Sequence, residues 1–541
     1  MPRALNRAST FIGWFLRRPL EIRLPGPTRG RGARNRGARM PMGRAACFRY
    51  PWWRPIRTHA FDLDGEANGV TSEYEVGDTM DPRSRTLTPG HTRNTPRHDK
   101  ATTSAVVWAP GAWPLAGHTV PLMRRPLDFV TSLAAHGDVV RLRLGALPCY
   151  ALTHPEWVQH VLVGGARDFT RGRLFEKASL FLGEGLVTSS GRIHHRARRA
   201  VQPAFHHQRI PAYTAVMGRV AENVVARWRP GQVVAVDRAM NDLSLGVLAN
   251  TLLPSGLGSR ASAEFHRALP ALSRGMMVRL LLPEWWARVP VASNRRFDRA
   301  RHTMERLVGQ AIAAHRDTGG DRADMLSLLL TQRDADGRGL TGRQIHDHVT
   351  SLAVAAVETT GATLAWFFHE LGRHREIEER VHTEVDTVLG GRPPRFEDLP
   401  ALAFTGRVVL ETLRRYPPWM ITRRATAPVR FGTVSVPGGA ELLYSPYALH
   451  HDPRWFAAPR RFDPDRWLPE RARALPKGAF IPFGAGAYKC VGETFALAEM
   501  TMAVATVCGR WRLRPLPGAR VRVVARANIH PNRLPMVAEA R

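Results

Sequence analysis

The segment that most constrains the fold is residues 480–499, FIPFGAGAYKCVGETFALAE, where one cysteine lies in a glycine-rich loop just before an amphipathic helix. A thiolate is stabilised near the positive end of a helix dipole and near backbone N–H groups. Gly484, Gly486 and Gly492 let the backbone approach a flat ligand and donate to sulfur. Phe483 can pack beside the sulfur and exclude water. The segment therefore predicts that Cys490 is a buried thiolate used for chemistry.

A lone cysteine is more often a small buried hydrophobe. Here several residue types recur at fixed offsets, in the pattern F-x-x-G-x-x-x-C-x-G-x-x-x-A-x-x-E, which runs through Phe483, Gly486, Cys490, Gly492, Ala496 and Glu499. This segment resembles the cysteine signature of the cytochrome P450 family. The resemblance implies that Cys490 ligates the iron of haem b (iron protoporphyrin IX). It also implies that the cofactor lies against Phe483, Gly484, Gly486, Gly492 and Ala496.

The cysteine count and the apolar runs limit the class of protein. A chain of 541 residues has room for several domains, but single-domain enzymes also reach this length. No pair of cysteines has C-x-x-C or zinc-site spacing among Cys47, Cys149, Cys490 and Cys508. This usage predicts a reducing, cytoplasmic location. No uninterrupted apolar run reaches the ~20 residues of a membrane span, so no transmembrane segment is predicted.

The net charge of +32 at first suggests a nucleic-acid partner. Only four of the 78 basic residues are lysines, however, and codon bias in a GC-rich genome accounts for such an excess of arginine. No zinc finger, helix-turn-helix or RNA-binding signature accompanies the charge. We therefore predict no nucleic-acid partner and favour an acidic protein partner.

Residues 1–104 differ from the rest of the chain. Residues 1–60 carry fourteen arginines against one acid, Glu21, and residues 61–100 are polar and rich in turn formers. This composition predicts a disordered basic extension. The alternatives are an arm that contacts a membrane or a partner, and sequence upstream of the true start codon. Residues 105–541 are predicted to form one haem-thiolate monooxygenase domain, with order starting near Trp108.

Periodicity predicts a mainly α chain with a small β portion, an α+β fold. Alternating apolar runs at 139–145 and 149–154 predict a β-hairpin. Helical periodicity dominates from about residue 156 and is longest over 341–372, where one stripe holds Ile345, Val349, Leu352, Ala356, Thr359 and Thr363. Helices are also predicted at 374–389 and 399–415, a β-rich stretch at 428–447 and a final helix after Cys490. The resemblance implies the cytochrome P450 fold, one large helical domain around haem.

Glu411 and Arg414 form an E-x-x-R pair on one helical face. Alone, such a pair is usually an exposed salt bridge of little consequence. The segment RYPPW follows it, and later FDPDRW at 462–467. The resemblance implies that Arg466 joins the pair in a buried structural network under the cysteine loop.

The long helix carries AAVETTG at 355–361, which matches the family's acid–alcohol pair at Glu358 and Thr359. The resemblance implies that these two residues are catalytic and deliver protons during oxygen activation. The sequence departs from the family pattern because Ala356 replaces the usual glycine. The alternative is an ordinary helix in which threonine hydroxyls bond back to backbone carbonyls.

The segment SGRIHHRARRAVQPAF at 190–205 resembles the family's helix over the haem propionates. The resemblance implies that His194 and Arg198, four residues apart, donate to a propionate. Arg423 and Arg424 offer a further donor, and the sequence does not choose between them. Where the family usually has Arg or His two residues before the cysteine, this chain has Tyr488, which donates a hydrogen bond without a charge.

Three apolar stretches, residues 175–182, 276–286 and 417–421, are expected to line the substrate pocket if the family topology holds. The candidate contacts are Phe175, Phe181, Leu352, Ala355, Trp419 and Met420. Plain core packing is the alternative for each of them. The stretch at 276–286, MMVRLLLPEWW, also suits a membrane surface.

The resulting hypothesis is a bacterial haem-thiolate monooxygenase that inserts one atom of O2 into an apolar small molecule, such as a terpene, fatty acid or similar secondary metabolite. Because 51 residues follow Cys490, no fused reductase is expected. Electrons would come from a separate ferredoxin and ferredoxin reductase, and the enzyme would be a monomer. The alternatives are a haem-thiolate isomerase, coupling enzyme or peroxide user, and a degenerate haem- or lipid-binding protein.

Overall fold

The computed structural model describes residues 21–22, 106–252, 259–282, 284–317, 325–333, 337, 339–526 and 528–541. The predictions for the remainder of residues 1–104 lie outside this part of the chain. The described helices are α2 (Thr119–Arg124), α3 (Pro126–Ser132), α4 (Pro155–Gln159), α5 (Arg173–Leu182), α6 (Gly191–Val201), α7 (Ile210–Val225), α8 (Val236–Leu252), α9 (Ser259–Leu281), α10 (Ala292–Asp317), α11 (Met325–Thr331), α12 (Gly342–Leu371), α13 (Arg375–Leu389), α14 (Ala403–Arg415), α15 (Pro446–His450), α16 (Pro469–Arg473) and α17 (Glu493–Cys508).

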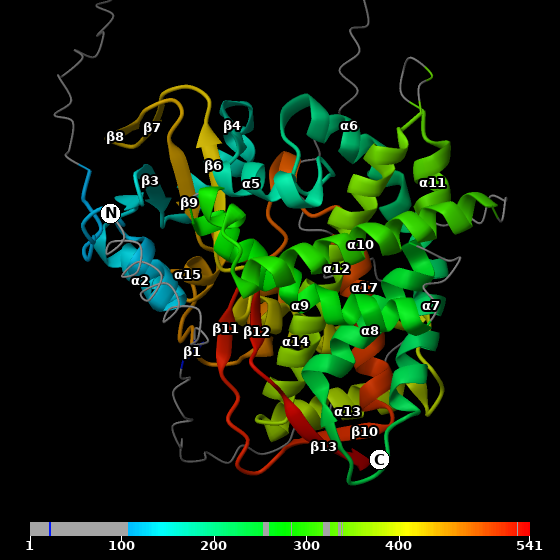
Figure 1. Cartoon of the computed structure of the whole chain (residues 1–541). Coiled ribbons are helices and arrows are strands. Elements are labelled where there is room, and N and C mark those ends of the chain that lie inside the picture. Colours follow the sequence, from blue (N-terminus) through cyan, green and yellow to red (C-terminus); the bar gives the residue numbers. More distant parts are fainter. Residues whose placement is uncertain are drawn as a thin grey trace, which may run out of the picture.

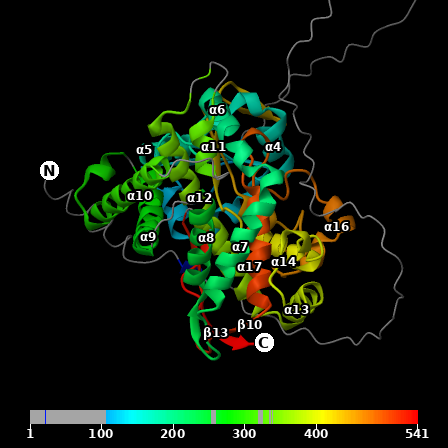
Figure 2. The same ribbon diagram turned by 90° about the vertical axis from the view of Figure 1, so that its right-hand side faces the viewer.

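The longest helix, α12, is the centre of the helical part (Figure 1). It begins at a capping box, in which the Thr341 side chain and the Gln344 side chain each bond the other residue's backbone N–H. It packs against α8, while α7 packs against α17, and Figure 2 shows α7, α8 and α17 side by side. Apolar side chains from α7, α12, α14 and α17 form one core cluster. The predicted long helix is confirmed within a residue or two at each end.

Helix α12 is buried on nearly every side, so the single stripe expected from sequence understates its burial. Among the described helices it alone is long and apolar enough to cross a membrane, but 78% of its apolar window is buried inside the protein. Such burial is typical of the core helix of a globular domain.

The strands form four small sheets. Their bounds are β1 (Glu21–Ile22), β2 (Val139–Leu144), β3 (Leu147–Leu152), β4 (Phe169–Arg171), β5 (Val233–Ala235), β6 (Ile421–Ala425), β7 (Val429–Phe431), β8 (Val434–Val436), β9 (Glu441–Tyr444), β10 (Trp511–Pro515), β11 (Val523–Ala525), β12 (Ile529–Pro531) and β13 (Pro535–Ala540). The largest sheet has the order β2-β3-β9-β6-β4. The other sheets are β10-β13-β5, β1-β11-β12 and β7-β8.

The predicted hairpin is confirmed as β2 and β3, which pair antiparallel from Val139↔Leu152 to Leu144↔Leu147. The predicted helices at 374–389 and 399–415 are present as α13 and α14, and the helix after Cys490 is present as α17. The strands β10–β13 after α17 were not predicted. The mainly α fold with a small β portion is confirmed.

Candidate haem-thiolate site

The cysteine loop is a tight turn held by its own backbone. The Cys490 N–H donates to the Phe483 carbonyl at 2.8 Å. Gly484 and Gly486 have φ values of 68° and 64°, in the left-handed region that favours glycine. A Cβ at Gly486 would also collide with the Leu162 carbonyl oxygen. These two positions therefore require glycine, and they fix the direction in which Cys490 leaves the loop.

Two observations on Cys490 differ at first sight. Its side chain is accessible to water, yet burial is the main cause of its raised pKa. The two observations agree if the sulfur borders a space inside the fold. The backbone N–H of Gly492 lowers the pKa of the thiol, Glu493 raises it, and Arg198 lowers it again. An iron ion at the sulfur would add a much larger stabilisation of the thiolate.

The middle of α12 borders an accessible space too. Ala355, Ala356, Glu358 and Thr359 are only partly buried, whereas the other residues of α12 from 348 to 371 are buried. Ala356 and Val491, the neighbour of Cys490, pack against the same apolar cluster. This arrangement fits a cofactor between the cysteine loop and the middle of α12.

The predicted acid–alcohol pair has partners in the structure. The Thr359 hydroxyl donates to the Ala355 carbonyl at 2.6 Å. This is the bond to the preceding turn that threonine makes in an ordinary helix, the alternative to a catalytic role. Glu358 lies near Arg526: burial lowers the pKa of Arg526, Arg274 lowers it further, and Glu358 raises it. Charged side chains therefore lie beside the middle of α12.

A cationic cluster lies beside the cysteine loop and consists of His194 and three arginines, Arg171, Arg198 and Arg423. The Cζ atoms of Arg171 and Arg423 lie 4.5 and 4.8 Å from the centre of the Tyr488 ring. The His194 ring lies 4.5 Å from the same ring. Arg198 donates to the Lys489 carbonyl at 2.6 Å, which ties α6 to the loop.

The cationic cluster has no acid of its own. Within the described part of the chain, no Asp or Glu forms an ion pair with Arg171, Arg198 or Arg423. Burial and the neighbouring Arg423 lower the pKa of Arg171 to about 9. Burial, Arg171 and Arg198 lower the pKa of His194 to about 3, and its buried Nδ1 has no hydrogen-bond partner. Buried cations with open donors fit a ligand with carboxylates, such as the two propionates of haem.

The choice between Arg423 and Arg424 follows from strand alternation on β6. Arg424 Nε lies 2.8 Å from Glu441 and Nη1 lies 2.6 Å from Glu176, so Arg424 is paired away from the cluster. Sequence reasoning missed Arg171. Its only signal is structural, because β4 pairs with β6 in a register that places Arg171 opposite Arg423.

The structure brings Glu411, Arg414 and Arg466 together. Arg414 donates to both Glu411 oxygens, at 2.9 and 2.8 Å, and Arg466 Nε lies 3.5 Å from Glu411 Oε1. Glu411 and Arg414 are fully buried. Arg414 also donates to the His450 carbonyl, and His450 Nε2 accepts the N–H of Ile481 at the start of the cysteine loop. This network therefore connects α14 to the loop.

Four of the six predicted substrate contacts fall into two apolar clusters, Phe181 with Leu352 and Trp419 with Met420. Phe175 lies 4.6 Å from the Arg171 guanidinium, whereas Phe181 packs edge-on against Phe297. Trp419 is almost fully buried, and its Nε1 donates to the Arg526 carbonyl at 2.5 Å. The remaining residues are Leu352 and Ala355 on α12, and Met420, which packs with the cluster that contains Trp419.

Comparison with known proteins agrees with this geometry. The cytochrome P450 family model matches residues 109–529. Cyclooctat-9-en-7-ol 5-monooxygenase of Streptomyces melanosporofaciens is 43% identical over 436 residues, which is 80% of this chain and 95% of the relative. Pentalenene oxygenase of Streptomyces avermitilis is 39% identical over 436 residues, which is 80% of this chain and 97% of that relative. The predicted enzyme class, a haem-thiolate monooxygenase with haem b, is confirmed. The chain belongs to the cytochrome P450 family.

Proposed function

We propose that this monooxygenase oxidises a terpene, with Cys490 as the axial ligand of the haem iron. The observation that carries the assignment is the Cys490 thiol beside a cationic cluster whose arginines pair with no acid of the described residues. The names of the two relatives, a cyclooctat-9-en-7-ol monooxygenase and a pentalenene oxygenase, support a terpene as the substrate class.

In this proposal each part of the site has one task. The glycines of the loop bring backbone N–H groups to sulfur, and Phe483 excludes water. Arg171, Arg198, Arg423 and His194 hold the propionates. When bound, haem b supplies the iron at which O2 is activated. Thr359 and Glu358 move protons, which requires the Thr359 hydroxyl to leave the Ala355 carbonyl.

The charges beside α12 refine the substrate class. Arg526 lies near Glu358 and Arg274, and its carbonyl accepts a hydrogen bond from the Trp419 ring N–H. Charged groups beside a pocket can bond a polar group of a ligand, which a pure hydrocarbon lacks. We therefore favour a terpene that already carries a polar group, such as a hydroxyl, over an unfunctionalised hydrocarbon.

The proposal includes partners and surroundings. Electrons come from an acidic ferredoxin and its reductase, and α6 presents exposed Arg192, Arg196 and Arg199 next to the cysteine loop. The enzyme acts as a cytoplasmic monomer. Residues 105–541 form the enzyme domain and residues 1–104 an extension to it.

The test is the absorption spectrum of the reduced full chain with and without carbon monoxide. A thiolate ligand gives a strongly red-shifted haem band, and Cys490→Ala is expected to abolish it. Cys149→Ala is the matched control, because Cys149 is buried in a core cluster. An unshifted band in folded, haem-loaded protein contradicts the ligand assignment. Turnover of a hydroxylated terpene with a ferredoxin system, compared with its hydrocarbon parent, then tests the substrate class.

A further inference from the structure

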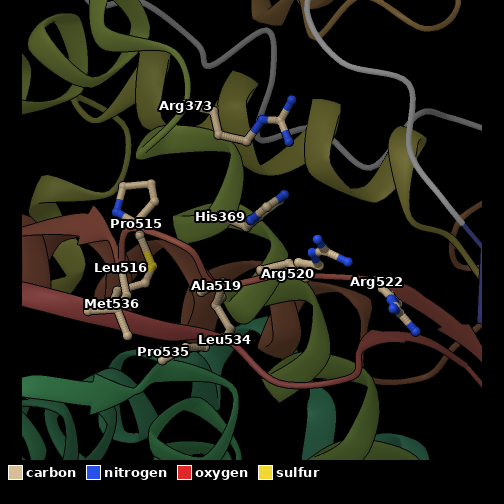
Figure 3. A pocket seen from close by; sticks show the side chains of 11 residues that line it. His369, Arg373, Pro515, Leu516, Ala519, Arg520, Arg522, Leu534, Pro535 and Met536 are labelled. Carbon is tan, nitrogen blue, oxygen red and sulfur yellow. The ribbon is translucent and has the colours of Figure 1, made fainter.

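A second cavity lies at the C-terminal end of α12, away from the proposed haem site at the middle of this helix. Its volume is about 470 Å³, and it lies between the end of α12, the β10–β11 connection and the start of β13 (Figure 3). His369 follows Thr359 by ten residues, about 15 Å along the helix at ~1.5 Å per residue. The cavity is therefore separate from the site around Cys490.

The walls of this cavity combine an apolar floor with a cationic edge. The partly exposed apolar residues include Leu516, Ala519 and Pro535, whereas Leu534 and Met536 are buried in a core cluster, and Arg373, Arg520 and Arg522 are the cations. In Figure 3 the side chains of Arg373, His369 and Arg520 point toward the same side. A neighbouring cavity of about 660 Å³ shares Leu516, Ala519 and Pro535 with it, and it adds Arg238 and Arg533.

His369 is the unusual group in the lining. Its side chain is only 6% exposed, and its Nε2 atom has no hydrogen-bond partner. Burial lowers its pKa to about 4, so the ring is neutral near pH 7 and offers an N–H or a lone pair. A buried ring nitrogen without a partner costs free energy, which a ligand atom reaching it would recover.

The acids around the cavity are already engaged. Glu370 accepts the Tyr416 hydroxyl and lies 3.5 Å from Arg415. Asp237, in the neighbouring cavity, accepts the Leu534 N–H at 2.8 Å. Among the described residues no acid forms an ion pair with Arg373 or Arg520. The cavity therefore has an excess of positive charge over an apolar floor.

We propose that this cavity binds a small amphiphile, an apolar chain that ends in an oxyanion. The head group, a carboxylate or a phosphate, lies between Arg373 and Arg520 and accepts the Nε2–H of His369. The chain lies along Leu516, Ala519 and Pro535, which also line the neighbouring cavity. A guanidinium fork suits either head group.

The experiment is calorimetric titration of the holoenzyme with decanoate and with decyl phosphate, while the haem absorbance reports any binding at the haem. The double variant Arg373→Glu/Arg520→Glu is expected to weaken binding about tenfold or more, because it removes charge-assisted hydrogen bonds. The matched control is Arg219→Glu/Arg473→Glu, two exposed arginines on α7 and α16, which is expected to leave binding unchanged. His369→Phe keeps a ring against Trp366, and we expect it to weaken binding about threefold.

Each further outcome decides the proposal. Stronger binding of decanoate than of decyl phosphate, or the reverse, identifies the head group. Equal binding to the double variant and the wild type overturns the site, as does binding that always changes the haem spectrum. Equal affinity for decanol overturns recognition of an oxyanion. Equal affinity for inorganic phosphate overturns the role of the apolar floor.

Discussion

Two regions of this protein bury arginine side chains, and they differ in whether a carboxylate is buried with them. In the network of Glu411, Arg414 and Arg466, the acid accepts hydrogen bonds from Arg414 and from the Trp467 ring N–H, and Arg466 forms an ion pair with it. In the cationic cluster beside Tyr488, no acid of the described chain is present. The chain supplies the acid of the first network, whereas we propose that a dianionic ligand supplies the acid of the second. On this proposal, the first set of buried charges holds the fold and the second set binds the cofactor.

The largest expected effect is on stability in the complete network. Glu411→Gln leaves the fully buried Arg414 without its counter-charge, so we expect a loss of about 3–5 kcal/mol in the free energy of unfolding. Urea unfolding of the haem-free protein followed by circular dichroism measures it. A loss below about 1 kcal/mol would mean that the network does not hold the fold, and the two regions would then not differ as described.

The second effect is on cofactor affinity at the cationic cluster. Arg423→Leu removes a cation that has no acidic partner, so we expect little change in the stability of the haem-free protein. Haem affinity is expected to fall about 10- to 100-fold, because a buried carboxylate loses a charged donor. Haem transfer to an excess acceptor protein measures it.

Arg424→Leu is the neighbouring control for this second experiment. Arg424 lies on the other face of β6 and is paired with Glu176 and Glu441. It is expected to leave haem affinity unchanged. Equal haem loss in both variants would show that the alternation of β6 does not decide which arginine serves the cofactor.

The third effect concerns Glu499 on α17, a buried acid whose pKa is raised to about 8 by burial. Because the folded-state pKa lies above the ordinary value of 4.5, its stabilisation is complete below that value and is lost as pH rises through about 8. Relative to Glu499→Gln, the free energy of unfolding of the wild type is expected to fall by about 1.4 kcal/mol per pH unit between pH 5 and 8. Parallel pH profiles of unfolding for the two proteins would contradict a buried neutral acid.

The smallest effect is expected at an exposed pair. Arg375 and Glu379 form an i,i+4 pair at 3.1 Å on α13, and both side chains are more than half exposed. Glu379→Gln should change the free energy of unfolding by about 0.5 kcal/mol or less, because water and salt screen the pair. Thermal unfolding at low and high salt measures this change. An effect as large as that of Glu411→Gln would show that burial does not decide how strongly an ion pair stabilises the fold.

Much of the site was predictable because its signals are local. The residues that predict the chemistry of the cysteine loop lie within one stretch of twenty, because the glycines, the cysteine and the helix start are close in sequence. Glu411 and Arg414 share one turn of α14, so their pairing follows from helical spacing. His194 and Arg198 share a face of α6 for the same reason. Long periodic helices such as α12 were predicted with small errors at their ends.

Other features depend on contacts between residues far apart in the chain. Arg171 joins the cationic cluster only because β4 pairs with β6, and nothing local to Arg171 indicates that register. The charges of Arg526 and Arg274 near Glu358, and the short strands β10–β13, had no periodic signal either. Sequence by itself predicted Cys490 as the iron ligand and determined the helical class and the order of the long helices, because these signals lie in neighbouring residues. Only the tertiary structure decided which arginines face the cofactor and which histidine lines the second cavity, because strand register and helix packing set those positions.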